Sequence, residues 1–513
     1  MTFTEIKVWC ADAPSARLVP VLRELLPYVP VTQADALADA TLKIAVIPGI
    51  SDRAEYFELH LEGKERVSIC GKDYRGLVNA AAALVQLIEH RDGVFCLPDI
   101  ELADAPEASF RSFMIDPARN LIPMDELRAL ILSMAKSRLN VLHIHLSDSK
   151  GFAYASDIFP DLPPAPGGVY SKSDLKEIID YAGMFGIDVL PEIDVPGHSN
   201  ATTDWKPHLK CVVPGKEVSG WNLCLGNPES YKLIDALLGE VAEIFPYEYI
   251  HIGTDEMDMR DLHPLISHTE ECETCNAFFA PLGLQTICER FYWFVRRVYK
   301  TVTGLGKKMM MWNDDIDISV SPDIPRDILI EFWRVAAERR GPVEGCSMQR
   351  FIDEGFEVIN ADFPNTYVDE YVECDKLKAW NYKRDPADAG KQAYQILGGE
   401  MCAWEGSNYP HFLHALYFAM PAFGARLWHT APIGDDADAK EALTRAVLGC
   451  DVPDGFDLFA YTKDVPLGTA RFWDTIYADD VDLEALRRVL RTLKHQSEDE
   501  RRLTERLIAM SEK

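Results

Sequence analysis

Short apolar runs alternate with longer amphipathic stretches from about residue 110 onward. Eight such runs occur in this region: Phe113–Ile115, Val141–Leu146, Ile187–Ile193, Tyr249–Ile252, Lys308–Trp312, Ile328–Trp333, Phe356–Ala361 and Ile396–Trp404. Several of the intervening stretches carry apolar residues at helical spacing: Met124–Arg138, Ser173–Phe185, Tyr231–Phe245 and Thr286–Val302. Strands that alternate with helices predict a parallel sheet, and eight such units predict that the sheet closes into a barrel. Runs that are apolar throughout fit this fold because both faces of a barrel strand are covered.

The first hundred residues show a different pattern. Four segments look extended, and they are followed by one stretch with helical spacing: Glu5–Trp9, Leu42–Val46, Glu58–Leu61 and Arg66–Cys70, then Tyr74–His90. Two prolines, Pro98 and Pro106, indicate that Leu97–Ser109 is a linker. From about Gly434 the chain is charged and helical, and Leu483–Ile508 is typical of a long amphipathic helix that closes the barrel or contacts a second subunit.

These patterns predict an α/β protein of three parts. A (β/α)8 TIM barrel spans residues 106–430, a small α/β domain precedes it over 1–105, and a helical C-terminal extension follows over 431–513. A chain of 513 residues is long enough to bury a barrel-sized core with smaller additions.

Charge and composition narrow the classes of partner. The chain carries 82 acidic against 52 basic residues, for a formal net charge of -30, which repels phosphate backbones and anionic lipid surfaces. The sequence therefore argues against nucleic acid and membrane partners. Its start has no basic segment followed by an apolar run, so we expect a cytoplasmic location. The 12 cysteines are scattered, and we expect no disulfides.

Polar and aromatic residues follow each predicted barrel strand, at the end of the fold where active sites lie. In chain order they are Arg119; Asp148; Glu192, Asp194 and His198; Asp255 and Glu256; Trp312, Asn313 and Asp314; Trp333 and Arg334; Tyr367 and Asp369; and Trp404 and Glu405. Tryptophans beside carboxylates suit a sugar, because its apolar face stacks on a ring while its hydroxyls need polar partners. A carbohydrate is the predicted substrate class.

Asp255 and Glu256 are the most informative pair among these residues. Two adjacent acids repel each other and tend to take different protonation states, which suits a reaction that needs one proton donor and one anion. The pair therefore points to acid-catalysed bond cleavage. The alternative is that both acids only cap the next helix.

The other positions have structural alternatives as well. A single tryptophan such as Trp333 is more often part of a core than a ligand platform. Arg119 could be a structural ion-pair partner, and His198 could satisfy a loop carbonyl. Because polar residues recur after successive strands, one shared site is favoured over these separate structural roles.

Several motifs resemble those of the beta-N-acetylhexosaminidases of glycoside hydrolase family 20. The family's mark is His-x-Gly-Gly-Asp-Glu, which stands here as HIGTDE with Thr254 in place of the second glycine. Further matches follow in the expected order: IDPARN around Arg119, LNVLHIHLSD ending at Asp148, LPEIDVPGHSNA around His198, MMMWND around Trp312, Tyr367-Val-Asp369, and GGEMCAW ending at Trp404. The resemblance covers roughly residues 110–430.

The resemblance implies retaining hydrolysis in which the substrate's 2-acetamido oxygen is the nucleophile. Glu256 would be the general acid and later the base, with a raised pKa, and Asp255 would stay ionised and orient the acetamido N–H. The remaining implied roles concern binding. Trp312, Trp333 and Trp404 would wall the pocket, Tyr367 would donate to the acetamido oxygen, Arg119, Glu405 and Asp369 would bind hydroxyls, and Asp148 and His198 would support the catalytic pair.

Two local departures from the family pattern bear on sugar specificity. Glu405 follows Trp404 directly, where the family commonly has Trp-x-Glu. Asp148-Ser-Lys-Gly-Phe152 replaces Asp-Asp-Gln-Gly-Trp, which removes a carboxylate and introduces Lys150. A solvent-exposed Lys150 is the simpler interpretation, and an anionic substituent on the substrate is the alternative.

Three other hypotheses compete. A metal-dependent barrel hydrolase could use His143 and His145, which lie on one face of a strand. A catalytically silent sugar-binding protein is disfavoured because both carboxylates are present. Cys272 and Cys275, near His263 and His268 and joined by Cys211 or Cys224, could form a structural zinc site, although a single CxxC pair favours unbound thiols. We predict no cofactor and no catalytic metal; a homodimer, and gluco or galacto specificity, are left open.

Overall fold

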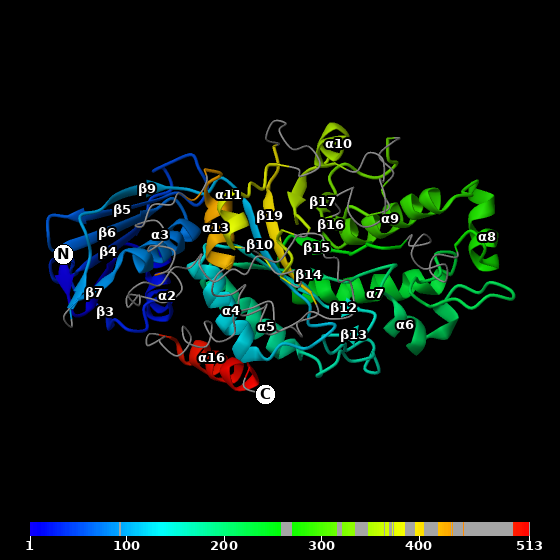
Figure 1. Ribbon diagram of the computed structural model, residues 1–513, viewed down its shortest axis with the longest axis horizontal. Coiled ribbons are helices and arrows are strands. Elements are labelled where there is room, and N and C mark those ends of the chain that lie inside the picture. The colour runs from blue at the N-terminus through cyan, green and yellow to red at the C-terminus, as the bar shows by residue number, and fades with distance from the viewer. Residues whose placement is uncertain are drawn as a thin grey trace.

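Eight parallel strands form a closed barrel at the centre of the computed structural model (Figure 1). The structure describes residues 1–91, 94–257, 269–314, 316, 321–333, 347–363, 365–368, 372, 374–384, 395–404, 419–431, 433, 445 and 496–511. In barrel order the strands are β10 (Phe110–Ile115), β11 (Val141–His145), β14 (Asp188–Glu192), β15 (Tyr249–His251), β16 (Lys308–Trp312), β17 (Leu329–Phe332), β18 (Val358–Asn360) and β19 (Gly398–Ala403). The eight apolar runs of the sequence are these eight strands, so the predicted TIM barrel is confirmed.

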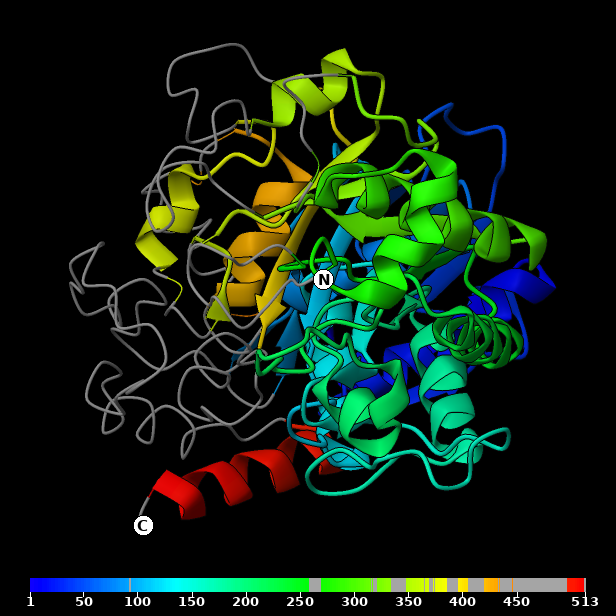
Figure 2. The same ribbon diagram turned by 90° about the vertical axis from the view of Figure 1, so that its right-hand side faces the viewer.

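Helices cover the outside of the barrel, as the helical spacing predicts (Figures 1 and 2). The long ones are α4 (Met124–Lys136), α5 (Lys172–Met184), α7 (Pro228–Ile244) and α9 (Ile287–Gly304), and shorter ones are α10 (Met348–Asp353), α11 (Cys374–Ala379) and α13 (Met420–Trp428). Ser171 and Thr286 begin α5 and α9 with capping boxes, in which the side chain accepts from the backbone of Asp174 and Glu289. Such caps satisfy the first N–H groups of a helix and fix where it starts.

The N-terminal unit is a six-stranded sheet with helices packed on it. Its strand order is β3-β2-β4-β6-β5-β9, and these strands span Val31–Gln33, Ile6–Cys10, Leu42–Val46, Arg66–Gly71, Phe57–Glu62 and Glu101–Asp104. Its helices are α1 (Ala13–Ala16), α2 (Leu18–Leu25) and α3 (Tyr74–Leu87), and a separate sheet joins β1 (Thr2–Phe3), β8 (Val94–Cys96) and β7 (Glu89–Arg91).

The interpretation of Leu97–Ser109 as linker throughout is wrong in one respect. Its segment Glu101–Asp104 is a strand that pairs antiparallel with β5. An edge strand covered on one side only shows no continuous apolar run, which is why the pattern between two prolines hid it. The N-terminal sheet thus ends at Asp104 and the barrel begins at Phe110; the domain boundaries at 105 and 430 stay predictions.

This N-terminal unit contacts the barrel at the end where the strands begin. Arg75 pairs with Asp188, the first residue of β14, and the hydroxyl of Tyr74 donates to the carbonyl of Met184 at 2.6 Å. Arg111, near the start of β10, is fully buried and pairs with Glu55. Because these contacts lie at the amino ends of the strands, they leave the carboxyl end of the barrel to its own loops.

The C-terminal helix α16 (Glu498–Ser511) packs against α4 on the outside of the barrel (Figure 1). Arg128 of α4 pairs with Asp499 at 2.6 Å, Lys136 pairs with Glu500 at 2.6 Å, and Leu503 is buried. The described part of the predicted C-terminal helix therefore covers the barrel. Within the described chain, no helix combines the length and the apolar character needed to cross a membrane.

Candidate active site

The adjacent carboxylates Asp255 and Glu256 lie in a tight turn directly after β15. Gly253, Thr254 and Glu256 have positive φ angles of 65°, 81° and 53°. A Cβ at Gly253 would lie 1.9 Å from Oδ1 of Asp194, so only glycine fits there. Thr254 is β-branched, and a positive φ costs such a residue backbone strain. Strained backbone concentrates at functional sites, and this turn carries both acids at the mouth of the barrel.

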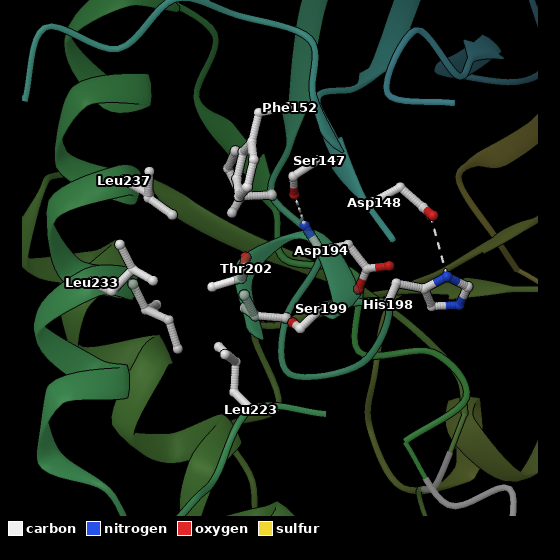
Figure 3. Close-up of a pocket in the computed structure, with 13 residues that line it drawn as sticks. Ser147, Asp148, Phe152, Asp194, His198, Ser199, Thr202, Leu223, Leu233 and Leu237 are labelled. Atoms are coloured by element: carbon white, nitrogen blue, oxygen red, sulfur yellow. Dashed lines mark hydrogen bonds and ion pairs between the residues drawn. The ribbon is translucent and has the colours of Figure 1, made fainter. Parts of the chain in front are cut away.

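His198 joins the two acids to a third carboxylate. Its Nε2 lies 3.3 Å from Oδ2 of Asp255 and 3.6 Å from Oε2 of Glu256, and its Nδ1 lies 3.2 Å from Oδ2 of Asp148. Figure 3 shows the pairing of Asp148 with His198. Burial alone would lower the pKa of His198, but the carboxylates of Asp255, Asp148 and Asp194 raise it well above its usual value. A protonated imidazole here holds the acids in place by charge.

Asp148 is the centre of a buried ion network behind His198. It accepts from Nε2 of His145 at 3.0 Å and lies 2.9 Å from Nη2 of Arg119. Burial would raise the pKa of Asp148, yet Arg119 and His198 hold it well below its usual range. Arg119 also pairs with Asp116 at 2.8 Å, and its guanidinium lies 5.2 Å from the ring of Trp404. Arg119 therefore links the ionic side of the mouth to its aromatic side.

The loop after β14 holds the backbone of the turn that carries Asp255 and Glu256. The indole N–H of Trp221 donates to the carbonyl of Glu256 at 3.2 Å, and the amide of Asn222 donates to the carbonyl of Met257 at 2.9 Å. The backbone N–H of Glu256 donates to Oδ2 of Asp314 at 2.9 Å. Gly197 allows the close approach, because a Cβ there would lie 2.5 Å from the carbonyl oxygen of Asp255.

Several buried polar atoms at the mouth have no hydrogen-bond partner among the described residues. Oδ1 of Asp255 and Nε1 of Trp333 are two of them. A buried acceptor or donor without a partner is costly unless a ligand or water supplies one. The acceptor on Asp255 and the donor on Trp333 are therefore available to a polar ligand.

Aromatic rings form the opposite side of the mouth. Trp333 and Tyr367 stack with centroids 6.2 Å apart, Tyr367 lies 6.5 Å from Trp404, and Trp404 lies 5.9 Å from Trp312. Trp333 and Trp404 are half-buried, whereas Trp312 is 1% exposed and its indole N–H donates to Glu192 at 2.8 Å. Trp312 thus supports the wall from below, and the other rings offer a surface to a ligand.

A second set of histidines and glutamates lies sealed inside the barrel, below the mouth. Nε2 of His143 lies 3.2 Å from Glu192 and its Nδ1 lies 3.0 Å from Glu400, while His145 contacts Glu192 and Asp148. Burial would lower the pKa of His143, but Glu400 and Glu192 raise it to about 9. Among the described residues, no group of side chains close enough to share a metal ion contains both His143 and His145. The geometry therefore favours an ion network over a metal site that uses this pair.

A small hollow lies beside this network, between the ends of β11 and β14 and helix α7 (Figure 3). Asp148, Asp194 and His198 line one side of it, and Leu233 and Leu237 of α7 line the other. Its leucine wall offers few partners for sugar hydroxyls, so we place the ligand instead on the side of His198 that faces Asp255.

The structure brings together nine of the eleven predicted site residues. They are Arg119, Asp148, His198, Asp255 and Glu256 on the ionic side, and Trp312, Trp333, Tyr367 and Trp404 on the aromatic side. Asp369 and Glu405 lie outside the described residues. Their roles, like the substrate contacts of the other nine, stay predictions.

Sequence reasoning assigned no role to several residues that hold the site. Asp194 and Asp314 were among the polar residues expected after barrel strands, though without a role, and Asp116, directly after β10, carried the same signal. Trp221 and Asn222 lie in a long loop and match no motif. Only the folded structure shows that they contact the turn that carries Asp255 and Glu256.

Known proteins match the chain over the barrel and beyond. Residues 109–431, more than half of the chain, match the model described as "Glycosyl hydrolase family 20, catalytic domain". The human beta-hexosaminidase subunit beta is 28% identical over 69% of this chain and 62% of its own length. The beta-hexosaminidase of Vibrio furnissii is 26% identical over 70% of this chain and 59% of its own. The chain thus spans about three fifths of the length of these relatives.

Solved structures show the same fold. An exo beta-N-acetylglucosaminidase of Vibrio harveyi, determined with N-acetylglucosamine, has a TM-score of 0.72 at 22% identity, covering 87% of this chain and 73% of that one. A chitobiase of Flavobacterium johnsoniae has a TM-score of 0.73 at 23% identity, covering 87% and 70%. At these identities the likeness establishes the architecture, and the active-site chemistry must come from the residues.

Proposed function

Since this chain belongs to glycosyl hydrolase family 20, we propose that it is an exo-acting beta-N-acetylhexosaminidase. It removes terminal beta-linked N-acetylglucosamine or N-acetylgalactosamine from oligosaccharides or glycan ends. The observation that carries the proposal is the placement of Asp255 and Glu256 side by side against His198, at the same end of the barrel as the rings of Trp333, Tyr367 and Trp404. A proton donor and an anion beside a stacking surface are what this hydrolysis needs.

The substrate supplies the nucleophile in the proposed mechanism. The acetamido oxygen bonds to the anomeric carbon as the glycosidic bond breaks, and Glu256 gives its proton to the leaving oxygen. A cyclic oxazolinium intermediate results. Glu256, now a carboxylate, takes a proton from water as that water attacks the anomeric carbon, which restores both the acetamido group and the configuration.

Asp255 serves as the anion in this scheme. Its unpartnered Oδ1 accepts the acetamido N–H, and its charge stabilises the positive charge that develops on the oxazolinium. Its other oxygen lies 3.3 Å from His198, which fixes the direction of the carboxylate. An oriented carboxylate stabilises the transition state without having to reorient during the reaction.

The aromatic side binds the sugar and excludes water. Trp333 and Trp404 enclose the acetamido methyl and the sugar face, with Trp312 beneath them, and the Tyr367 hydroxyl donates to the acetamido oxygen. Closing a site to water strengthens its electrostatic interactions. Arg119 and Glu405 are the proposed partners of the outer hydroxyls, and Asp369 is the proposed partner of a hydroxyl near the reducing side.

A panel of aryl glycosides tests the proposal. We expect turnover of beta-linked 2-acetamido sugars and none of the matching 2-hydroxy sugars, because only the former carry the nucleophile. Comparing the gluco and galacto forms measures specificity, and NMR of the first-formed anomer tests retention. Brisk cleavage of plain glucosides would refute substrate assistance, and no turnover of any 2-acetamido sugar would favour a silent sugar-binding protein.

A cytoplasmic location and a homodimer are further proposals. The cysteines whose side chains the structure describes are free thiols, which suits a reducing compartment. Light scattering of the purified chain would measure the oligomeric state directly.

A further inference from the structure

Four buried cysteines from two separate loops converge at one point beyond the barrel mouth. They are Cys211 and Cys224, from the loop between β14 and α7, and Cys272 and Cys275, at the start of α8 (Glu273–Phe279). All four sulfur atoms lie within 4.8 Å of one another. Helix α8 lies at the right-hand end of Figure 1.

Local backbone structure brings each pair together. Lys210 and Leu223 form an antiparallel bridge, and the N–H of Cys224 donates to the carbonyl of Leu209 at 2.7 Å, which places Cys211 beside Cys224. In the other segment, the N–H of Asn276 donates to the carbonyl of Cys272 at 2.9 Å, closing the first turn of α8 around Cys272 and Cys275.

The two pairs are also pressed against each other. A Cβ at Gly226 would lie 2.4 Å from the Cα of Cys275, so a glycine is needed where the loops cross. Outside the cluster, Lys216 pairs with Glu271 at 2.6 Å across the same two loops. The close approach is thus built into the backbone of both segments.

The distances between the sulfur atoms match the edges of a metal-centred tetrahedron. The Sγ atoms of Cys211 and Cys275 are 3.9 Å apart, those of Cys224 and Cys272 are 3.9 Å apart, and those of Cys224 and Cys275 are 3.5 Å apart. Zinc binds cysteine sulfur at about 2.3 Å, which makes the edge of a regular tetrahedron about 3.8 Å. A disulfide would need about 2.05 Å, and none of these pairs comes near it.

We propose that Cys211, Cys224, Cys272 and Cys275 hold one structural zinc ion. The ion has four protein ligands and no open position, so it takes no part in hydrolysis. Binding sends the thiol protons to solvent and leaves four thiolates on the metal. The site goes beyond the proposed hydrolase activity, and its test does not depend on that activity.

The zinc ion stabilises the loop that contacts the turn carrying Asp255 and Glu256. Trp221 and Asn222, which donate to the carbonyls of Glu256 and Met257, stand just before Cys224. On the other segment, Thr269 and Asn276 flank the second cysteine pair and are held by Arg290 of α9, which donates to Oδ1 of Asn276 at 2.7 Å. The metal therefore joins a loop from β14 to a segment anchored on α9.

Metal analysis of the purified full-length chain tests the site. We expect about one zinc per chain by inductively coupled plasma mass spectrometry, and at least a tenfold loss in the double variant Cys272→Ser and Cys275→Ser. The matched control is Cys96→Ser, in β8 of the separate three-stranded sheet, and this variant should keep its zinc. Cobalt substitution of the wild type gives the intense sulfur-to-cobalt absorption of a tetrahedral thiolate site.

A measurement on the wild type covers the case in which the double variant does not fold. Stepwise titration of the native protein with a mercurial should release the zinc as the four clustered thiols react, and the melting temperature should fall when the metal is removed. Three results would overturn the proposal: zinc content equal in the double variant and the control, a disulfide between any two of the four cysteines, or iron in place of zinc.

Discussion

The two halves of the barrel mouth are built in different ways. The half that follows β10, β11, β14 and β15 is ionic, and its side chains are held by charge: Asp148 lies 2.9 Å from Arg119 and 3.2 Å from His198. The half that follows β16 to β19 is aromatic and is held by ring packing, as in the stacked pair Trp333 and Tyr367. The contrast separates two tasks, because oriented charge acts on the transition state whereas a stacking wall binds ground state and transition state alike.

Replacing the proposed proton donor should have the largest effect. In Glu256→Gln we expect kcat to fall by about 10²–10⁴ with little change in KM, because general acid catalysis contributes about that much. Steady-state kinetics on aryl 2-acetamido glycosides measure it. A good leaving group needs less protonation, so the loss should shrink with nitrophenyl substrates. An equal loss for good and poor leaving groups would contradict the acid role.

Neutralising the proposed anion should come next. In Asp255→Asn we expect kcat to fall by about 10²–10³, because a preorganised group that stabilises developing charge is worth about that much. His198 loses one of its carboxylate partners as well, at 3.3 Å, so circular dichroism and the melting temperature should be checked in the same sample. A rise in KM with unchanged kcat would place Asp255 in simple binding and remove the distinction between the halves.

On the aromatic half the effect should fall on KM. In Trp333→Ala we expect KM to rise roughly tenfold and kcat to change less, since losing an aromatic stacking partner costs about 0.5–1.5 kcal/mol beyond its buried area. The matched control is Trp205→Ala in α6 (Asn200–Trp205), a half-buried tryptophan that donates to Asp161 outside the mouth. If kcat fell as steeply as in the acid variants, the wall would be part of the transition-state machinery.

The smallest effect should be on stability against pH, through the ion network below the mouth. The pKa of His143 in the folded chain is about 9, above its unfolded value of roughly 6.5. Its contribution is therefore complete below about pH 6.5 and is lost as the pH rises toward 9. Chemical denaturation at several pH values should show the free energy of unfolding falling across this window, and His143→Gln should flatten the fall. If the free energy of unfolding changed with pH equally in the variant and the wild type, another group than His143 would be responsible.

The barrel could be predicted because its strands are buried on both faces, which leaves unbroken apolar runs such as residues 309–312 in the sequence. The edge strand Glu101–Asp104 could not, because it is covered on one side and leaves no such run. The same distinction applies to the site. Asp255 and Glu256 were visible as neighbours at a strand end, whereas the support that Trp221 gives them crosses 35 residues.

The four clustered cysteines show most clearly what could not be predicted from the sequence. Cys272 and Cys275 carry a readable CxxC spacing, but Cys211 and Cys224 are 13 positions apart, and the sequence offered either one as a partner without indicating that both join the pair. The bridge between Lys210 and Leu223 brings that second pair together, and loop packing at Gly226 brings it to the first.

The order of apolar and polar residues established the strands, the helices and the chemical types at the strand ends, because periodicity and neighbouring charge are local properties of a chain. Which of those side chains meet was settled by the folded loops. His198 contacts both Asp148 and Asp255 across 50 and 57 residues. Such contacts depend on where whole segments pack, and packing is determined by the sum of many weak interactions that no short stretch of sequence contains.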